Sequence, residues 1–126
     1  MHIYTKGDDM DCGVKAIEYL LKLRKQEHAD LIHSLQQHMQ ERGLSIFKII
    51  EICKSYGISV KAYKSKKIYP TTPYIAYLRG FKYGHYVVIE KVSKWQVEIY
   101  DAKYKSFKIC KLLLYLIWGR KILIMK

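Results

Sequence analysis

Three residues spread along the chain have the types and neighbours that cysteine-based catalysis needs. Cys12 stands in Asp11-Cys12-Gly13 at the expected start of a helix, where unpaired backbone N–H groups and the helix dipole favour an anion. A cysteine in such a place can have its pKa lowered from about 8.5 to about 3.5–7.5, which supplies a thiolate at neutral pH. Gly13 leaves room for a substrate backbone. A lone free cysteine is more often a small buried hydrophobe, so Cys12 needs partners before it indicates chemistry.

A cysteine nucleophile requires a base, and the base requires a group that orients it. His85 begins an expected strand in Gly84-His85-Tyr86-Val87-Val88, and Asp101 follows the next expected strand. If the two strands form an antiparallel hairpin that turns at Ser93-Lys94, a register that pairs His85 with Asp101 has eight residues on each side of Ser93. A strand-end histidine and a turn aspartate are each common, but together with Cys12 they predict a catalytic triad.

The elements that must position these residues divide the chain near Gly57. Before it, helical periodicity covers Cys12 to about Lys25, about Ala29 to Met39, and Ser45 to Tyr56. Asp11 and Ser45 are expected N-caps, and Gly43 and Gly57 expected stops. The first helix is expected to bury one broad side, made of Ala16, Ile17, Leu20, Leu21 and Leu23.

After Gly57, short runs of β-branched and aromatic residues predict strands, separated by turn residues such as Pro70, Pro73, Gly80 and Gly84. The expected strands are Ile58–Tyr63, Tyr74–Leu78, His85–Val92, Gln96–Tyr100 and Ser106–Cys110. The tail from Lys111 predicts a short helix, a break at Gly119 and a last strand from Ile122 to Met125. Helices followed by an antiparallel sheet are typical of an α+β domain, and 126 residues suffice for one such domain, 1–126.

Composition limits the classes of function. Three widely spaced cysteines fit neither a disulfide framework nor a paired-cysteine zinc site, and indicate free thiols in a reducing cytoplasm. The formal charge of +12 favours an anionic partner, although basic residues occur along the whole chain and a biased genome would give the same excess. The longest apolar run, Leu112 to Trp118, is far shorter than the roughly 20 residues of a membrane-spanning helix.

Read in order, the motifs resemble the double-glycine cysteine peptidases that process bacteriocins and form the N-terminal domain of peptidase-containing ABC exporters. The resemblance covers nearly the whole chain and rests on short motifs in a fixed order, which are Asp11-Cys12-Gly13, Gly43-Leu44-Ser45, Tyr56-Gly57-Ile58, Pro73-Tyr74-Ile75, His85-Tyr86-Val87-Val88, Asp101 and Trp118-Gly119. It implies a papain-like fold with N-terminal helices packed on a C-terminal antiparallel sheet.

The resemblance also implies a function and partners. The reaction would be cleavage of a leader peptide after two small residues, with Cys12 as nucleophile, His85 as acid and base, and Asp101 as the residue that orients the histidine. The substrate candidates Gly13, Tyr83, Gly84 and Tyr86 flank the nucleophile and the histidine in sequence. Expected partners are the leader peptide and the transmembrane and ATP-binding domains of an exporter, which would hold the domain at the cytoplasmic face of the membrane.

Two positions depart from the family pattern. The family has a glutamine six residues before the cysteine, which completes the oxyanion hole with the backbone N–H of the nucleophile, and this chain has Lys6 there. Loss of such a donor typically costs about 2.7–4 kcal/mol of transition-state stabilisation. Lys6 is itself a donor, though flexible and strongly hydrated. The family's Asp-Pro is here Asp101-Ala102.

Other readings remain open. A peptidase-like module that binds leader peptides without cutting them is favoured by Lys6, and a nucleic-acid binder by basic and aromatic stretches such as Tyr63 to Lys67, although no recognised nucleic-acid module accompanies them. No metal or cofactor is expected. Three histidines, His28, His33 and His38, follow five-residue steps that rotate about 140° each along a helix and so share no face. The chain has no phosphate-binding G-x-x-x-x-G-K-[ST] loop.

Overall fold

The computed structural model describes residues 12–42, 45–79, 85–102 and 105–125. Three helices come first, α2 (Cys12–Leu23), α3 (Ala29–Arg42) and α4 (Ile46–Ser55). They are followed by β1 (Val60–Lys64), β2 (Tyr74–Leu78), β3 (His85–Val92), β4 (Gln96–Asp101), β5 (Lys105–Cys110), α5 (Lys111–Ile117) and β6 (Trp118–Met125). The expected α+β class, with N-terminal helices and a C-terminal antiparallel sheet, is confirmed.

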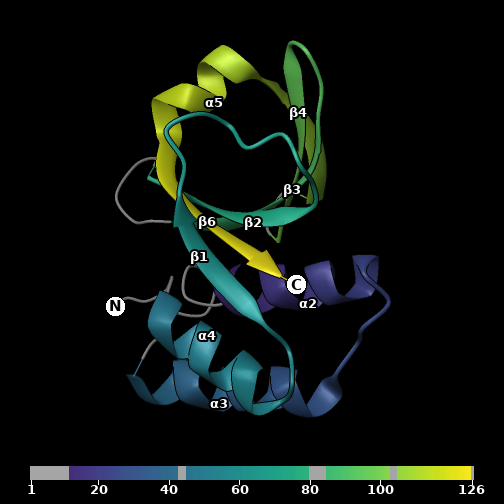
Figure 1. Cartoon of the computed structure of the whole chain (residues 1–126), viewed down its shortest axis with the longest axis vertical. Helices are drawn as coiled ribbons and strands as arrows, with labels where there is room; N and C mark the ends of the chain where they lie inside the picture. The colour runs from purple at the N-terminus through teal and green to yellow at the C-terminus, as the bar shows by residue number, and fades with distance from the viewer. Residues whose placement is uncertain (1–11, 43–44, 80–84, 103–104, 126) are drawn as a thin grey trace.

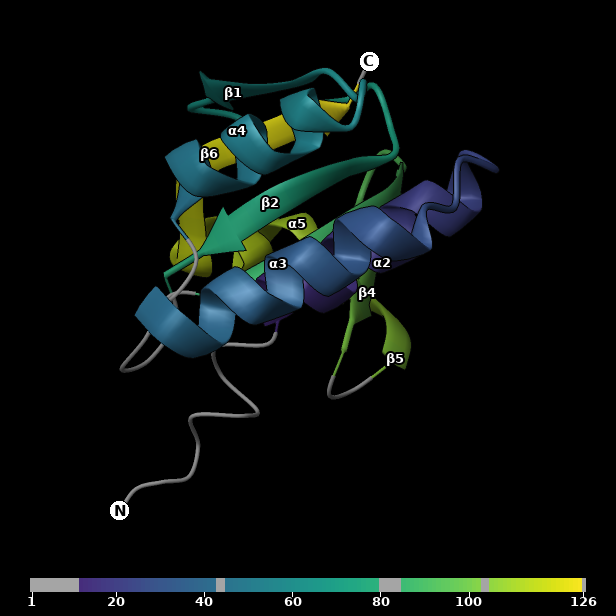
Figure 2. The same ribbon diagram turned by 90° about the horizontal axis from the view of Figure 1, so that it is seen from below.

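The strands form one six-stranded sheet in the order β1-β6-β2-β3-β4-β5, and every neighbouring pair is antiparallel. Helices α2, α3 and α4 gather at one end of the molecule and α5 lies at the other (Figures 1 and 2). Two cores follow from this layering. One joins the three helices to Ile75, Val88 and Leu123, and the other joins α5, through Leu114, to the opposite sides of the same strands.

Local chemistry explains the ends of α4. Ser45 caps it, because the Ser45 hydroxyl accepts a hydrogen bond from the Lys48 N–H. At its other end Gly57 has a φ of 79° and donates to the Lys54 carbonyl, while the Ile58 N–H bonds the Cys53 carbonyl. This pair of bonds is the Schellman motif, which a glycine completes without strain. The expected caps Asp11 and Gly43 lie outside the described residues.

Two sequence expectations about packing are wrong. Leu23, the last residue of α2, is 43% exposed and is not buried with the rest of its side of the helix. The expected break at Gly119 does not occur, since β6 runs from Trp118 through it. Gly119 is needed there for space: a Cβ would overlap the carbonyl oxygen of Tyr77, where the pairing of β2 with β6 shifts register.

Candidate active site

Cys12 lies buried at the first described turn of α2, directly over the start of β3. Its sulfur accepts a hydrogen bond from the backbone N–H of Tyr86, at an N···Sγ distance of 3.4 Å. The helix therefore presents the thiol to the strand that begins with His85. Cys53, by contrast, is enclosed in the core between α4 and the sheet, where burial raises its pKa to about 11.

His85 and Asp101 are joined by a direct hydrogen bond. The distance from His85 Nε2 to Asp101 Oδ2 is 2.7 Å, and Asp101, with 5% of its surface exposed, is the buried charged residue of the described chain. The hydrogen bond to Asp101, followed by one to the Cys12 side chain, raises the pKa of His85 to about 10, against a smaller opposing effect of burial. At neutral pH the ring is therefore an imidazolium. Because Nε2 faces Asp101, Nδ1 is the nitrogen left for the Cys12 sulfur.

The pairing of strands behind this contact differs from the expected one. The register places Val88 opposite Tyr100 and Val92 opposite Val97, so the loop of the hairpin holds four residues and His85 is not opposite Asp101. Glu90 is an extra residue, since Ile89 pairs with Ile99 and Lys91 with Glu98. The predicted register was therefore wrong. His85 and Asp101 meet instead as diagonal neighbours, a separation that side chains of this length can span.

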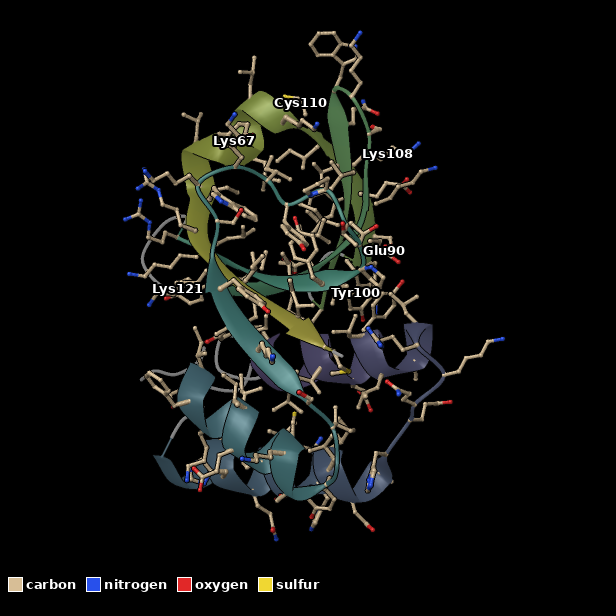
Figure 3. The ribbon with its side chains drawn as sticks, in the orientation of Figure 1. Lys67, Glu90, Tyr100, Lys108, Cys110 and Lys121 are labelled. Atoms are coloured by element: carbon tan, nitrogen blue, oxygen red, sulfur yellow. The ribbon has the colours of Figure 1, made fainter. Side chains whose placement is uncertain are left out.

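The extra residue Glu90 fixes α2 on the sheet. The Tyr19 hydroxyl donates to Glu90 Oε1 at 2.5 Å, and the Ser106 hydroxyl bonds Glu90 Oε2 at 3.2 Å. The Tyr19 ring stacks on Tyr100, with centroids 3.6 Å apart. Glu90 and Tyr100 lie on the part of the sheet next to α2 (Figure 3). The helix that carries Cys12 is thus tied to β3, β4 and β5, a contact that the sequence analysis did not find although Glu90 interrupts an apolar strand.

The remaining site candidates are only partly within the described residues. Gly13 is buried in α2, and Tyr86 is half-buried beside Cys12. Lys6, Tyr83 and Gly84 lie outside the described residues. Tyr86, one of the predicted substrate-binding residues, also lines a groove of about 500 Å³ whose other walls come from α4 and from strands β1, β2 and β6. Its lining is largely apolar and aromatic, made of Ser45, Ile46, Phe47, Ala62, Tyr63, Lys64, Tyr77, Tyr86 and Lys121.

Two features are absent from the described part of the chain. Residues 12–42, 45–79, 85–102 and 105–125 contain no cluster of three histidine, cysteine or acidic side chains that could hold a metal ion. Across the same ranges, none of the helices has the length and apolar character needed to cross a membrane.

Comparison with known proteins identifies the family. The model of the peptidase C39 family matches residues 1–126, while no curated protein matches the chain. Solved structures share the fold. A double glycine motif protease from an AMS/PCAT transporter, solved with the leader peptide, has a TM-score of 0.78 and 18% identity, with 100% of this chain and 88% of that chain covered.

The peptidase domain of Streptococcus ComA, described as a bifunctional ABC transporter, has a TM-score of 0.77 and 21% identity over 98% of this chain and 93% of its own. The N-terminal C39-like domain of a toxin secretion ATP-binding protein from Vibrio parahaemolyticus has a TM-score of 0.72 and 16% identity. The match covers 92% of this chain and 96% of that chain. These likenesses establish the papain-like fold, and the family model confirms the resemblance seen in the sequence. The chain belongs to the peptidase C39 family of cysteine peptidases.

Proposed function

We propose that this chain is a cysteine endopeptidase that removes double-glycine leader peptides from bacteriocin-like peptides before their export. The observation that carries the proposal is the contact of Cys12 with the ring of His85, which Asp101 holds from the other side. A helix N-terminus, an imidazolium and a buried carboxylate are the groups that stabilise a thiolate and return a proton to a leaving amine.

The reaction would proceed in two stages. The Cys12 thiolate attacks the carbonyl carbon of the second small residue, and the carbonyl oxygen becomes an oxyanion. As the peptide C–N bond breaks, His85 gives its Nδ1 proton to the leaving amine, and a thioester remains on Cys12. His85 then takes a proton from water, whose hydroxide attacks the thioester and frees the leader with a new carboxylate. Asp101 keeps the ring oriented throughout and supports it whenever it is charged.

Stabilisation of the oxyanion is assigned to the backbone N–H of Cys12 and the side chain of Lys6. The ammonium of Lys6 stands in the sequence where the family has an amide, and it offers both a donor and a positive charge. Because it is held less rigidly than a planar amide, we expect slower turnover than with glutamine at this position.

The groove beside Tyr86 is the proposed seat of the leader. Aromatic walls with two lysines, Lys64 and Lys121, suit an amphipathic helix that has an apolar face and acidic neighbours. Its position next to Tyr86, whose N–H bonds the Cys12 sulfur, would place the end of a docked helix at the nucleophile. The AMS/PCAT protease, similar in fold, is described in complex with its leader peptide.

We further propose that residues 1–126 form one peptidase domain, either acting alone or as the N-terminal domain of an ABC exporter. Its partners would then be the transmembrane and ATP-binding domains, at the cytoplasmic face of the membrane. The described domains of ComA and of the Vibrio protein belong to transport systems of this kind.

Incubation with a synthetic double-glycine leader peptide tests the activity. Cleavage after the second small residue is expected from the parent chain and none from Cys12→Ala. Replacement of the core thiol, Cys53→Ala, is the matched control and should leave cleavage in place. Absence of cleavage by both the parent chain and Lys6→Gln would refute the proposal.

A second function is favoured by Lys6, namely binding of leader peptides without cleavage. It predicts that the parent chain binds a fluorescent leader and leaves it intact, and that Lys6→Gln gains cleavage. Tyr77→Ala, in the groove, should weaken leader binding under either function.

A further inference from the structure

The net charge of the chain is confined to its second half. Residues 1–57 hold eight basic and eight acidic residues, whereas residues 58–126 hold fifteen basic and three acidic ones, so the formal charge of +12 belongs to the sheet and α5. A general bias in composition would have charged both halves alike. The uneven distribution indicates that the sheet half faces an anionic partner.

Helix α5 has apolar side chains on both of its sides. Leu114 is buried against the sheet, as expected for the inner side of a short helix. The outer side, which is normally polar, carries Leu112 and Leu116, each 81% exposed, together with the less exposed Leu113 and Tyr115. A leucine that keeps four fifths of its surface in water protrudes from the domain and contributes nothing to its core.

The protruding leucines are continuous with an exposed tryptophan. Trp95, in the loop between β3 and β4, is 73% exposed, and its carbonyl accepts a hydrogen bond of 2.9 Å from the Lys111 N–H at the start of α5. That loop and α5 lie at the end of the molecule farthest from α3 and α4 (Figure 1). We call Trp95, Leu112, Leu113 and Leu116 the α5 patch.

Lysines surround the α5 patch. The Lys94 ammonium lies 5.3 Å from the centre of the Trp95 ring, and Lys111 opens the helix. Lys67 lies beside α5 (Figure 3), on a segment whose next residue, Ile68, donates its N–H to the Tyr115 hydroxyl. Exposed leucine and tryptophan side chains with flanking lysines are typical of surfaces that bind the interface of a bilayer. The apolar side chains enter the boundary of the acyl chains, and the ammonium groups contact the lipid headgroups.

We propose that the α5 patch binds the surface of a bilayer containing anionic lipids. Nucleic acid would account for the lysines but leaves the protruding leucines in water. A protein partner would need a matching cavity for each leucine, whereas the headgroup region accepts them without one. None of the residues proposed for cleavage belongs to the patch, so the proposal goes beyond the peptidase function and its test does not require activity.

Vesicle binding tests the proposal with the whole chain. Co-sedimentation is measured with phosphatidylcholine vesicles and with vesicles that also contain phosphatidylglycerol, at low and high salt. We expect binding to the anionic vesicles, weakened by salt because screening shortens the reach of the lysines. Trp118 is only 4% exposed, so a blue shift of tryptophan fluorescence on binding would report entry of Trp95 into the interface.

Paired variants separate the apolar and the ionic contributions. Leu112→Ser with Leu116→Ser should reduce partitioning by at least about tenfold, since each leucine loses an apolar side chain from the interface. Leu23→Ser, at the exposed end of α2, is the matched control and should bind as the parent does. Lys67→Glu with Lys94→Glu should also weaken binding to anionic vesicles.

The proposal is overturned by any of four results. These are binding to neither kind of vesicle, equal binding to neutral and anionic vesicles, unchanged binding by the double leucine variant, or an equal loss with Leu23→Ser. If the chain forms a dimer that dissociates in the double leucine variant, and does not bind vesicles, the patch binds a second copy of the chain. If the chain binds a DNA duplex and does not bind vesicles, nucleic acid is the anionic partner of the basic half.

Discussion

Replacing Asp101 by asparagine removes one charge from the His85 contact while keeping its shape. The amide oxygen of asparagine can still accept from Nε2–H, as in papain-like sites that use Cys-His-Asn. The donor is still the charged ring, but the bond loses the attraction of the carboxylate charge. Hydrogen bonds to charged groups are worth about 1.5–3 kcal/mol and neutral ones about 0.5–1.5 kcal/mol. The difference between the middles of these two ranges, about 1.3 kcal/mol, gives the size of the expected loss and corresponds to about one pKa unit. We therefore expect the pKa of His85 to fall from about 10 by an amount of this size.

The assay is the rate of alkylation of Cys12 by iodoacetamide as a function of pH, which reads the thiolate and imidazolium pair without any peptide substrate. The background carries Cys110→Ser, because Cys110 is exposed, and the modified residue is identified by peptide mass spectrometry. Cys53 is buried and its raised pKa keeps it slow over most of the range. At alkaline pH the alkylation rate is expected to change as His85 loses its imidazolium proton. The midpoint of this alkaline change should lie about one pH unit lower in Asp101→Asn than in the parent.

Two controls make the result decisive. Glu98→Gln removes another carboxylate of β4, three residues earlier, and should leave the alkaline change where it is in the parent. Asp101→Ala removes the acceptor as well and should move the change further than Asp101→Asn does. If the profile of Asp101→Asn coincides with that of the parent, the Asp101 carboxylate does not hold the proton of His85 and the reasoning fails.

Three further results are expected. The free energy of unfolding should fall as pH rises from 6.5 to about 10, because His85 binds its proton more tightly in the folded protein than in the unfolded chain. Urea titrations at several pH values would show this fall, and His85→Gln should flatten it. Gly119→Ala should destabilise the fold by about 2–3 kcal/mol, because its Cβ meets the Tyr77 carbonyl; an unchanged urea midpoint would contradict it. Tyr19→Phe should cost about 1 kcal/mol by the same measurement, since the ring stack stays while the bond to Glu90 is lost, and a cost near zero would mean that water replaces that bond.

Local signals in the sequence predicted most of the elements. The bounds of β2 and β3 agree with the expectation from turn residues and β-branched runs, and Ser45 and Gly57 end α4 as their capping chemistry predicts. Gly119 shows the limit of such signals. A glycine predicts the end of a helix or strand when only its own backbone freedom is considered. Here Gly119 lies within β6, and its missing side chain leaves space for the carbonyl of a residue in the neighbouring strand.

The contact of His85 with Asp101 was predicted, but from a strand register that is wrong. Counting residues on each side of Ser93 assumes a regular hairpin, whereas the extra residue Glu90 and the four-residue loop shift the pairing by two to three positions. A bulge depends on contacts of the finished fold, in this case the bonds of Glu90 to Tyr19 and Ser106, and these are not visible in a strand read alone. Tyr86 was predicted to bind substrate, but the residues that share its groove were not predicted, since its walls come from strands and a helix far apart in sequence.

The proposed chemistry joins two layers of the fold, because the nucleophile lies on a helix and its base on the sheet. Cys12 and Tyr19 are seven residues apart, which is about two turns of α2, so both point to the same side of the helix. One contacts the start of β3 through Tyr86 and the other contacts Glu90 further along that strand. Two attachments along one strand fix the angle of the helix as well as its distance. The separation of sulfur and imidazole therefore depends on packing between the layers, and a substitution at Tyr19 can alter the reactivity of Cys12 from two helical turns away.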